Sequence, residues 1–143
     1  MIRDLTPDKA VEDAVAALVR ARDSEFGWAI NTPLLFPSGD SVTVNVAPFG
    51  RTYTVSDVGT GFAEAYSLDI AVAFERAANE IADEMGLTFE RHRIAVSDVD
   101  GSRLPGAIKL VANCSLSAVL LASERAKGRR VKERADIRGG RLR

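Results

Sequence analysis

Two aspartates and the single histidine of this chain are the side chains that could carry out hydrolysis. Asp40 precedes a run of alternating residues at 42–46, and Asp57 directly follows a second such run at 53–56. Carboxylates at strand ends can hold a metal ion or act as a general base, and His92 could move a proton. The same aspartates are typical of turns, where a carboxylate accepts hydrogen bonds from backbone N–H groups. Because no Glu-x-Lys pattern follows on a neighbouring strand, the sequence favours the turn role, with a small metal-dependent hydrolase or nuclease as the alternative.

Three further motifs match a functional pattern only in part. Val58-Gly-Thr-Gly61 lies between a strand and a helix, but Glu64 stands where a dinucleotide fingerprint has its third glycine. Asp98-Val-Asp-Gly-Ser102 is similar to the start of a calcium loop, but Lys109 takes the place of the bidentate glutamate. Cys114 has no second cysteine and lies in an apolar segment, which is typical of packing. The sequence therefore predicts no metal site and no cofactor.

The stretch 31–61 predicts the sheet that would position these residues. Val42, Val44 and Val46 alternate with polar residues, as do the residues of 52–56, which is the period of a strand with one buried face. Turn residues at 37–40 and 48–51 separate the runs, so a strand that begins near Phe26 joins them in one meander. The charged stretch 87–96 predicts a fourth strand at an edge, followed by a turn at 97–101.

Three helices complete the prediction. The first begins at Thr6 and ends near Arg22, and the second follows the third strand, with Asp69 as its N-cap and Gly86 as its left-handed stop. The third, from Leu104 to Lys127, is apolar around most of its circumference. We therefore expect one α+β domain over 1–127, with an antiparallel sheet of three to four strands, an N-terminal helix, a helix after the third strand and a long apolar C-terminal helix.

Composition and charge exclude several classes of protein. Of 143 residues, 46% are hydrophobic and 27% are charged, which is ordinary for a soluble chain. The apolar stretch 107–122 is interrupted by polar residues and falls short of the ~20 residues that span a bilayer, so we expect no membrane contact. The N-terminus lacks the apolar core of a signal peptide, and the single cysteine gives no reason to invoke an oxidising compartment. These features predict a cytoplasmic protein.

The charges are divided unevenly along the chain. Residues 127–143 carry eight Lys or Arg and two acids, a net charge of +6, which leaves 11 basic and 18 acidic residues, a net of −7, in 1–126. Glycine and arginine at 128–143 predict a mobile basic tail. Such a tail could contact nucleic-acid phosphates, although it lacks aromatic residues for base stacking. The cations that would do so are Arg129, Arg130, Lys132 and Arg134.

Several of these motifs together resemble the domain-of-unknown-function 1828 family of bacteria and their mobile elements. The residues that carry the resemblance are Thr32-Pro33, Asp40, Tyr53-Thr-Val-Ser-Asp-Val-Gly59 and Met85-Gly86-Leu87, within about 31–122. Where the family often has a second acid after the aspartate, this chain has Val58. The resemblance implies a small α+β domain from a bacterium or a phage, and it implies no particular activity.

The leading functional hypothesis is a non-catalytic protein-binding accessory module. Small uncharged side chains would form a flat sheet face for a partner, and the broad apolar arc of the last helix would leave surface for a homodimer. An acidic body could imitate nucleic acid, so one form of the hypothesis is an inhibitor of a host antiviral complex that targets nucleic acid. The residues expected to contact a protein partner are Thr43, Asn45, Thr52, Thr54, Leu110 and Leu121.

Overall fold

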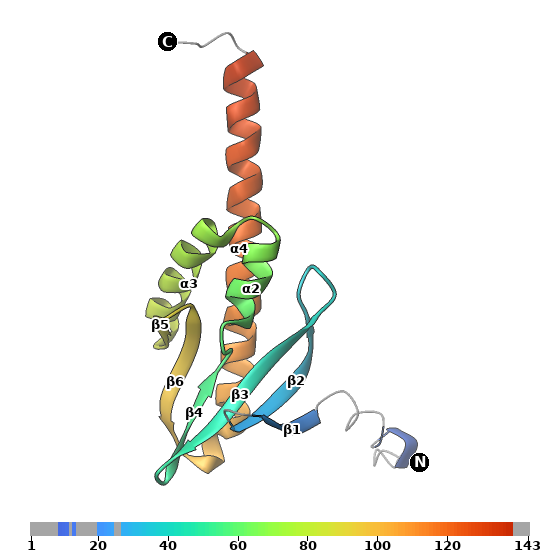
Figure 1. Cartoon of the computed structure of the whole chain (residues 1–143), viewed down its shortest axis with the longest axis vertical. Helices are drawn as coiled ribbons and strands as arrows, with labels where there is room; N and C mark the ends of the chain where they lie inside the picture. The colour runs from blue at the N-terminus through green and yellow to red at the C-terminus, as the bar shows by residue number, and fades with distance from the viewer. Residues whose placement is uncertain (1–8, 12, 14–19, 25–26, 139–143) are drawn as a thin grey trace, which may run out of the picture.

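The protein is an α+β domain in which one long helix packs against an antiparallel sheet (Figure 1). The computed structural model describes residues 9–11, 13, 20–24 and 27–138. Six strands in this part of the chain form one sheet with the order β1-β2-β3-β4-β6-β5. The strands are β1 (Arg20–Ser24), β2 (Gly27–Leu35), β3 (Ser41–Phe49), β4 (Thr52–Ser56), β5 (Thr88–Glu90) and β6 (Arg93–Val99). The helices are α2 (Thr60–Ser67), α3 (Ala71–Met85) and α4 (Leu104–Arg138), with a 3-10 turn, Gly101–Arg103, before α4.

The meander predicted from the alternating residues is confirmed as β2, β3 and β4. Val44 pairs with Ile30, and Val46 pairs with both Trp28 and Val55, so these apolar residues form rows across one face. Val42, Val44 and Val55 are fully buried there. Helix α4 contacts β2, β3, β4 and β6, and therefore covers that face of the sheet. Burial of each such valine stabilises the fold by roughly 1.5–3 kcal/mol.

The single edge strand predicted over 87–96 is wrong, because the chain turns back within it. Arg91 and His92 both have positive φ, 52° and 64°, and form a two-residue connection between β5 and β6. Left-handed values at both positions match the right-handed twist of a hairpin, and the Asn-Gly pair that usually indicates such a turn is absent at Arg91 and His92. Of these two strands, β5 lies at an edge of the sheet, whereas β6 lies between β4 and β5.

The turn predicted at 97–101 is also wrong over most of its length. β6 continues to Val99, and its register against β4 shifts between Tyr53 and Val55. Asp98, with φ 56°, is the extra residue of this bulge. The bulge returns Val99 to the buried face, which a strictly alternating strand could not do.

The N-terminal helix falls largely outside the described residues. Of the predicted span, only residues 9–11 and 13 are described as helical. Its predicted end near Arg22 is wrong, because β1 begins at Arg20 and pairs with β2 from Asn31 to Gly27.

The helix predicted between Asp69 and Gly86 is confirmed as α3, and the shorter helix α2 precedes it. Asp69 does not cap α3: it has φ 59° in the link from α2, and Ile70 occupies the N-cap without a side-chain hydrogen bond. Gly86 ends α3 at φ 72°, as predicted, because only glycine enters the left-handed region without steric cost.

Helix α4 extends beyond its predicted end at Lys127 and continues to Arg138. Residues 128–138 are therefore helical, and the mobility expected of the basic tail stays a prediction. The stretch Gly101–Lys132 is long and apolar enough to cross a membrane, so the length argument against a membrane span does not hold. Its apolar residues have another explanation, because Val111, Ala118 and Val119 are fully buried in the domain core.

Candidate functional site

Asp57, the best catalytic candidate in the sequence, lies inside the protein and is 0% exposed. Its Oδ1 accepts hydrogen bonds from the backbone N–H groups of Gly59 and Ile94, each at 3.0 Å. Its Oδ2 accepts the Ser115 hydroxyl at 2.8 Å. The Asp57 N–H in turn donates to the Ile94 carbonyl at 3.0 Å. One side chain thus links the end of β4 to β6 and α4.

Gly61 allows this close approach of α2 to α4. A Cβ at this position would collide with the Ser115 hydroxyl and would stand 3.1 Å from both Asp57 Oδ2 and Phe74 Cζ. Glycine is needed here because its neighbours fill the space that a side chain would occupy. The glycines that partly match a nucleotide fingerprint therefore serve a tight strand-to-helix turn, as the sequence favoured.

The environment of Asp57 raises its pKa above the usual range, because burial disfavours the charged carboxylate. The hydrogen bonds that it accepts act in the opposite direction and do not outweigh burial. A perturbed carboxyl group in an open cleft would be a candidate general base. Asp57 has no exposed surface, so its carboxylate cannot reach a substrate in this conformation.

The structure does not bring the two other catalytic candidates into a site with Asp57. Asp40 is exposed in the turn between β2 and β3, where its carbonyl accepts the Phe36 N–H at 2.8 Å. His92 stacks on Phe62 with ring centroids 3.7 Å apart, and its Nε2 lies 2.9 Å from Glu75 Oε1. Among the described residues, no group of three His, Cys, Asp or Glu side chains is placed to hold a metal ion.

Glu64, which sequence reasoning treated only as a missing glycine, is a second buried carboxylate. It is 6% exposed, and its two oxygens accept the Ser38 hydroxyl at 2.6 Å and the Ser38 N–H at 3.0 Å. It therefore holds the β2–β3 loop against α2. No sequence signal joins these residues, because they are 26 positions apart.

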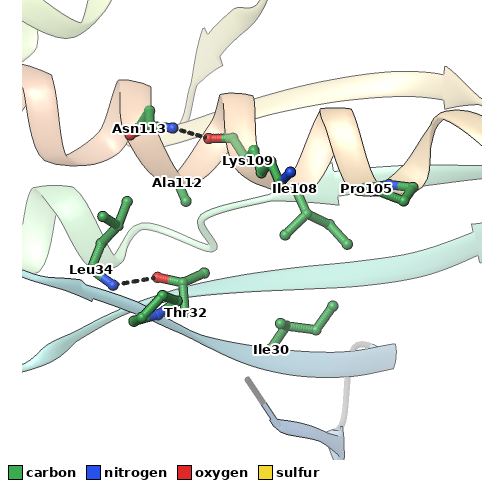
Figure 2. Close-up of a pocket in the computed structure, with 9 residues that line it drawn as sticks. Ile30, Thr32, Leu34, Pro105, Ile108, Lys109, Ala112 and Asn113 are labelled. Carbon is green, nitrogen blue, oxygen red and sulfur yellow. Dashed lines mark hydrogen bonds between the residues drawn. The ribbon is translucent and has the colours of Figure 1, made fainter. Parts of the chain in front are cut away.

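An apolar groove lies between β2 and the first turns of α4 (Figure 2). It has a volume of about 560 Å³, and its apolar lining includes Ile30, Leu34, Ile108 and Ala112. Two of its polar side chains already have partners: the Thr32 hydroxyl donates to the Val42 carbonyl at 2.6 Å, and the Asn113 amide donates to the Lys109 carbonyl at 2.9 Å. The remaining charged residue of the lining, Lys109, is exposed to solvent. A substrate site needs a few convergent polar groups with free capacity. The groove therefore offers mainly apolar contact and lacks the convergent polar groups of a substrate site.

The residues predicted to form a flat sheet face do share one face. In the pairing register Thr43, Asn45 and Thr54 lie opposite small or polar neighbours, and Thr52 lies opposite Phe49. This is the side of the sheet turned away from the buried valines. Thr43 donates a hydrogen bond across the strands to Asn31 Oδ1 at 3.0 Å. Thr43, Thr52 and Thr54 are half-buried, but Asn45 is 5% exposed and offers little surface. Phe49, at the end of the same face, is 75% exposed.

The apolar arc of α4 is covered mainly within one chain. Leu110 and Leu121 are half-buried and pack against the core, and Cys114 is 4% exposed. Helices α2 and α3 contact α4 beside the sheet, which accounts for an arc wider than one sheet could cover. Burial also raises the pKa of the Cys114 thiol, so the reactive thiolate is disfavoured.

The predicted nucleic-acid residues lie on the C-terminal end of α4. Arg129, Arg130 and Lys132 are exposed, and Arg134 belongs to the same helix. Arg125, just before them, is anchored to α3 by a 2.6 Å ion pair with Glu80. The sequence identified these cations but predicted a mobile tail, because a glycine at 128 and several like charges disfavour an isolated helix.

Comparison with protein-family models, curated proteins and solved structures gives no match for this chain. The resemblance to the domain-of-unknown-function 1828 family therefore stays a prediction.

We predict that Asp57→Ala lowers the free energy of unfolding by at least about 2 kcal/mol. The substitution leaves the Gly59 N–H and two buried donors, the Ile94 N–H and the Ser115 hydroxyl, without an acceptor, and each buried donor costs roughly 1–3 kcal/mol. Asp57→Asn should cost less than half as much, because its carbonyl oxygen can still accept the two backbone N–H groups. Urea denaturation gives both values, and Asp40→Ala, an exposed turn position, serves as control with an expected change within about 0.5 kcal/mol. Equal stability of Asp57→Ala and Asp40→Ala would contradict the role assigned to Asp57.

The pH dependence of stability tests the raised pKa of Asp57. A carboxyl group with a raised folded-state pKa binds more protons when folded than when unfolded, between 3.8 and the raised value. Its stabilising contribution is complete below the unfolded-state pKa and is lost as the pH rises through the folded-state pKa. We therefore predict that wild type gains stability relative to Asp57→Asn as the pH falls from about 7 to about 4. Denaturation of both proteins at each pH gives the difference between their unfolding free energies, in which the contributions of the other titrating groups cancel. A fall in the stability of wild type relative to Asp57→Asn on acidification would refute the raised pKa of Asp57.

Proposed function

We propose that this protein is a non-catalytic protein-binding module that uses the sheet face turned away from α4. The observation that carries the proposal is the composition of that face. Asn31, Thr43, Ala47, Thr52 and Thr54 are half-buried there and none carries a charge. In the described part of the chain, α4 contacts β2, β3, β4 and β6, and the buried valines of β3 and β4 lie on the opposite side of the sheet from these residues.

The dimensions of the face suit a protein partner better than a small ligand. A strand of nine residues such as β3 is about 30 Å long, and the three strands β2, β3 and β4 that carry these residues span about 10–15 Å. The flat area is then roughly 300–450 Å², about half of the ~800 Å² that each partner buries in a standard interface, so side chains around the face would have to complete the contact. Phe49 at its end supplies an exposed aromatic side chain, a type of residue that is enriched at protein interfaces.

The alternative of a metal-dependent hydrolase has less support. It requires Asp57 to meet a substrate together with Asp40 and His92, and the Asp57 carboxylate is enclosed by its own hydrogen-bond donors. His92 is held against Phe62 and Glu75.

We place the proposed module in the cytoplasm of a bacterium, encoded by the cell or by a phage. Docking on a host antiviral complex that targets nucleic acid is one form of this proposal, supported by the net charge of −7 over residues 1–126. Imitation of nucleic acid would make binding sensitive to salt, whereas contact through the uncharged face would not. A homodimer through α4 has less support than the sheet face, because Leu110 and Leu121 already pack against the core.

Affinity capture with matched variants tests the sheet face as the docking surface. We predict that wild-type protein retains a defined partner at both low and high salt, and that Thr54→Glu loses it, because the new carboxylate would be desolvated in the interface. Phe49→Ala should weaken retention at least tenfold without affecting folding, since this side chain is 75% exposed.

Asn79→Glu is the matched control, because it adds the same charge at an exposed position of α3. It should retain the partner as wild type does. Loss of the partner from Asn79→Glu but not from Thr54→Glu would place the interface on the helical side. If wild-type protein retains no partner at either salt concentration, the proposal that it is a protein-binding module is wrong.

A further inference from the structure

The C-terminal end of α4 is a helical arm with an unusual distribution of charge. We define the arm as residues 127–138, whose far end extends beyond the other elements of the domain (Figure 1), although Arg129 still borders the link between α2 and α3. Lys127, Arg129, Arg130 and Lys132 are exposed, and none of them has an ion-pair partner in the part of the chain that the structure describes. The sequence places Arg134 and Arg138 further along the same helix.

The four described cations point in several directions. At 3.6 residues per turn, each residue is rotated by about 100° from the last. Relative to Lys127, the helix therefore places Lys132 at about 140°, Arg129 at about 200° and Arg130 at about 300°. A helix that lies on a flat anionic surface needs cations on one side only. A helix with cations on all sides is suited to a channel that has negative charge on both walls.

Two classes of anionic partner fit this arm poorly. Helices that bind membrane surfaces have a broad apolar face opposite their cations. The two large apolar residues in the sequence of the arm, Val131 and Ile137, fall about 120° apart around a helix and form no such face. Duplex RNA has a major groove that is too narrow and deep for side chains to enter. The major groove of B-form DNA is about 12 Å wide, admits an α-helix and has phosphates along both edges.

The acidic body does not prevent such contact, because the arm projects away from it. Arg138 lies about 20 Å along the helix axis from Arg125, at 1.5 Å per residue. The Debye length at physiological ionic strength is about 8 Å, so repulsion between the body and a duplex at the far end of the arm is largely screened. Binding would also relieve repulsion between like charges three residues apart, such as Lys127 with Arg130 and Arg129 with Lys132.

We propose that the arm inserts into the major groove of duplex DNA and contacts phosphates on both sides without reading sequence. This inference is independent of the sheet-face function, because it rests on a different end of the molecule. The base edges need no specific partner here: Lys and Arg neutralise phosphates and release counterions, which supplies affinity for any sequence.

The test compares two triple variants that have the same net charge. Arg129→Gln/Arg130→Gln/Lys132→Gln removes three cations from the arm, and Arg76→Gln/Arg93→Gln/Arg103→Gln removes three exposed cations from the body. Binding of the full-length proteins to a labelled duplex DNA of arbitrary sequence is followed by fluorescence anisotropy over a range of salt concentrations. We expect the arm variant to bind more than tenfold more weakly at low salt. Its plot of log K against log salt should be shallower by about 2.7, since each phosphate contact contributes about 0.9. The body variant should keep the wild-type slope.

Several outcomes would overturn the proposal. Wild-type protein that does not bind the duplex at low salt, or equal losses in the two variants, would show that the arm is not a DNA-binding element. Tighter binding to duplex RNA or to a single strand would exclude the major groove. Binding to phosphatidylserine vesicles, or displacement of the duplex by an equal charge concentration of polyglutamate, would show that the arm recognises a membrane or an acidic protein instead.

Discussion

The carboxylate of Asp57 accepts hydrogen bonds from the turn that follows β4, from β6 and from α4. These elements are far apart in sequence: Ile94 is 37 residues away and Ser115 is 58. A buried carboxylate is costly unless its oxygens are satisfied, and in the described residues no buried side-chain oxygen or nitrogen lacks a hydrogen-bond partner. The position of α4 on the sheet therefore depends on Asp57, and the close approach at Gly61 depends on α4 lying there.

Local signals in the sequence predicted the parts of the fold that local chemistry determines. Alternating valines predicted β3, because a strand with one buried face depends on a two-residue period of side chains. Gly86 predicted the end of α3, because that end depends on one left-handed backbone angle. The hairpin at Arg91 and His92 and the bulge at Asp98 were missed. Both need positive φ from residues other than glycine, which only tertiary pairing imposes. The coverage of α4 by α2 and α3 was missed for a related reason, since a helical wheel shows how wide an apolar arc is and not what covers it.

The sequence identified the candidate residues of the site by their types, and the structure showed how those residues lie relative to one another. The sequence favoured a turn role for Asp57, and the structure gives it that role, but its partner Ser115 has no signal in the sequence because it lies in an apolar helix. Asp40 and His92 have the chemistry for a hydrolase and lie in separate environments. The surfaces left for function are then those that the fold leaves uncovered, namely the uncharged sheet face and the arm of α4.

The account depends most on the claim that the Asp57 carboxylate is a closed structural group. Amide hydrogen exchange of Gly59 and Ile94, measured by NMR in the native protein, tests this claim directly, because both N–H groups donate to Asp57 Oδ1. The account predicts that both amides exchange with the same opening free energy as the Val55 amide in the buried part of β4, so that they open only when the domain unfolds. Exchange of Gly59 and Ile94 orders of magnitude faster than that of Val55 would show that the carboxylate opens to solvent in the folded protein. A catalytic role for Asp57 would then have to be reconsidered.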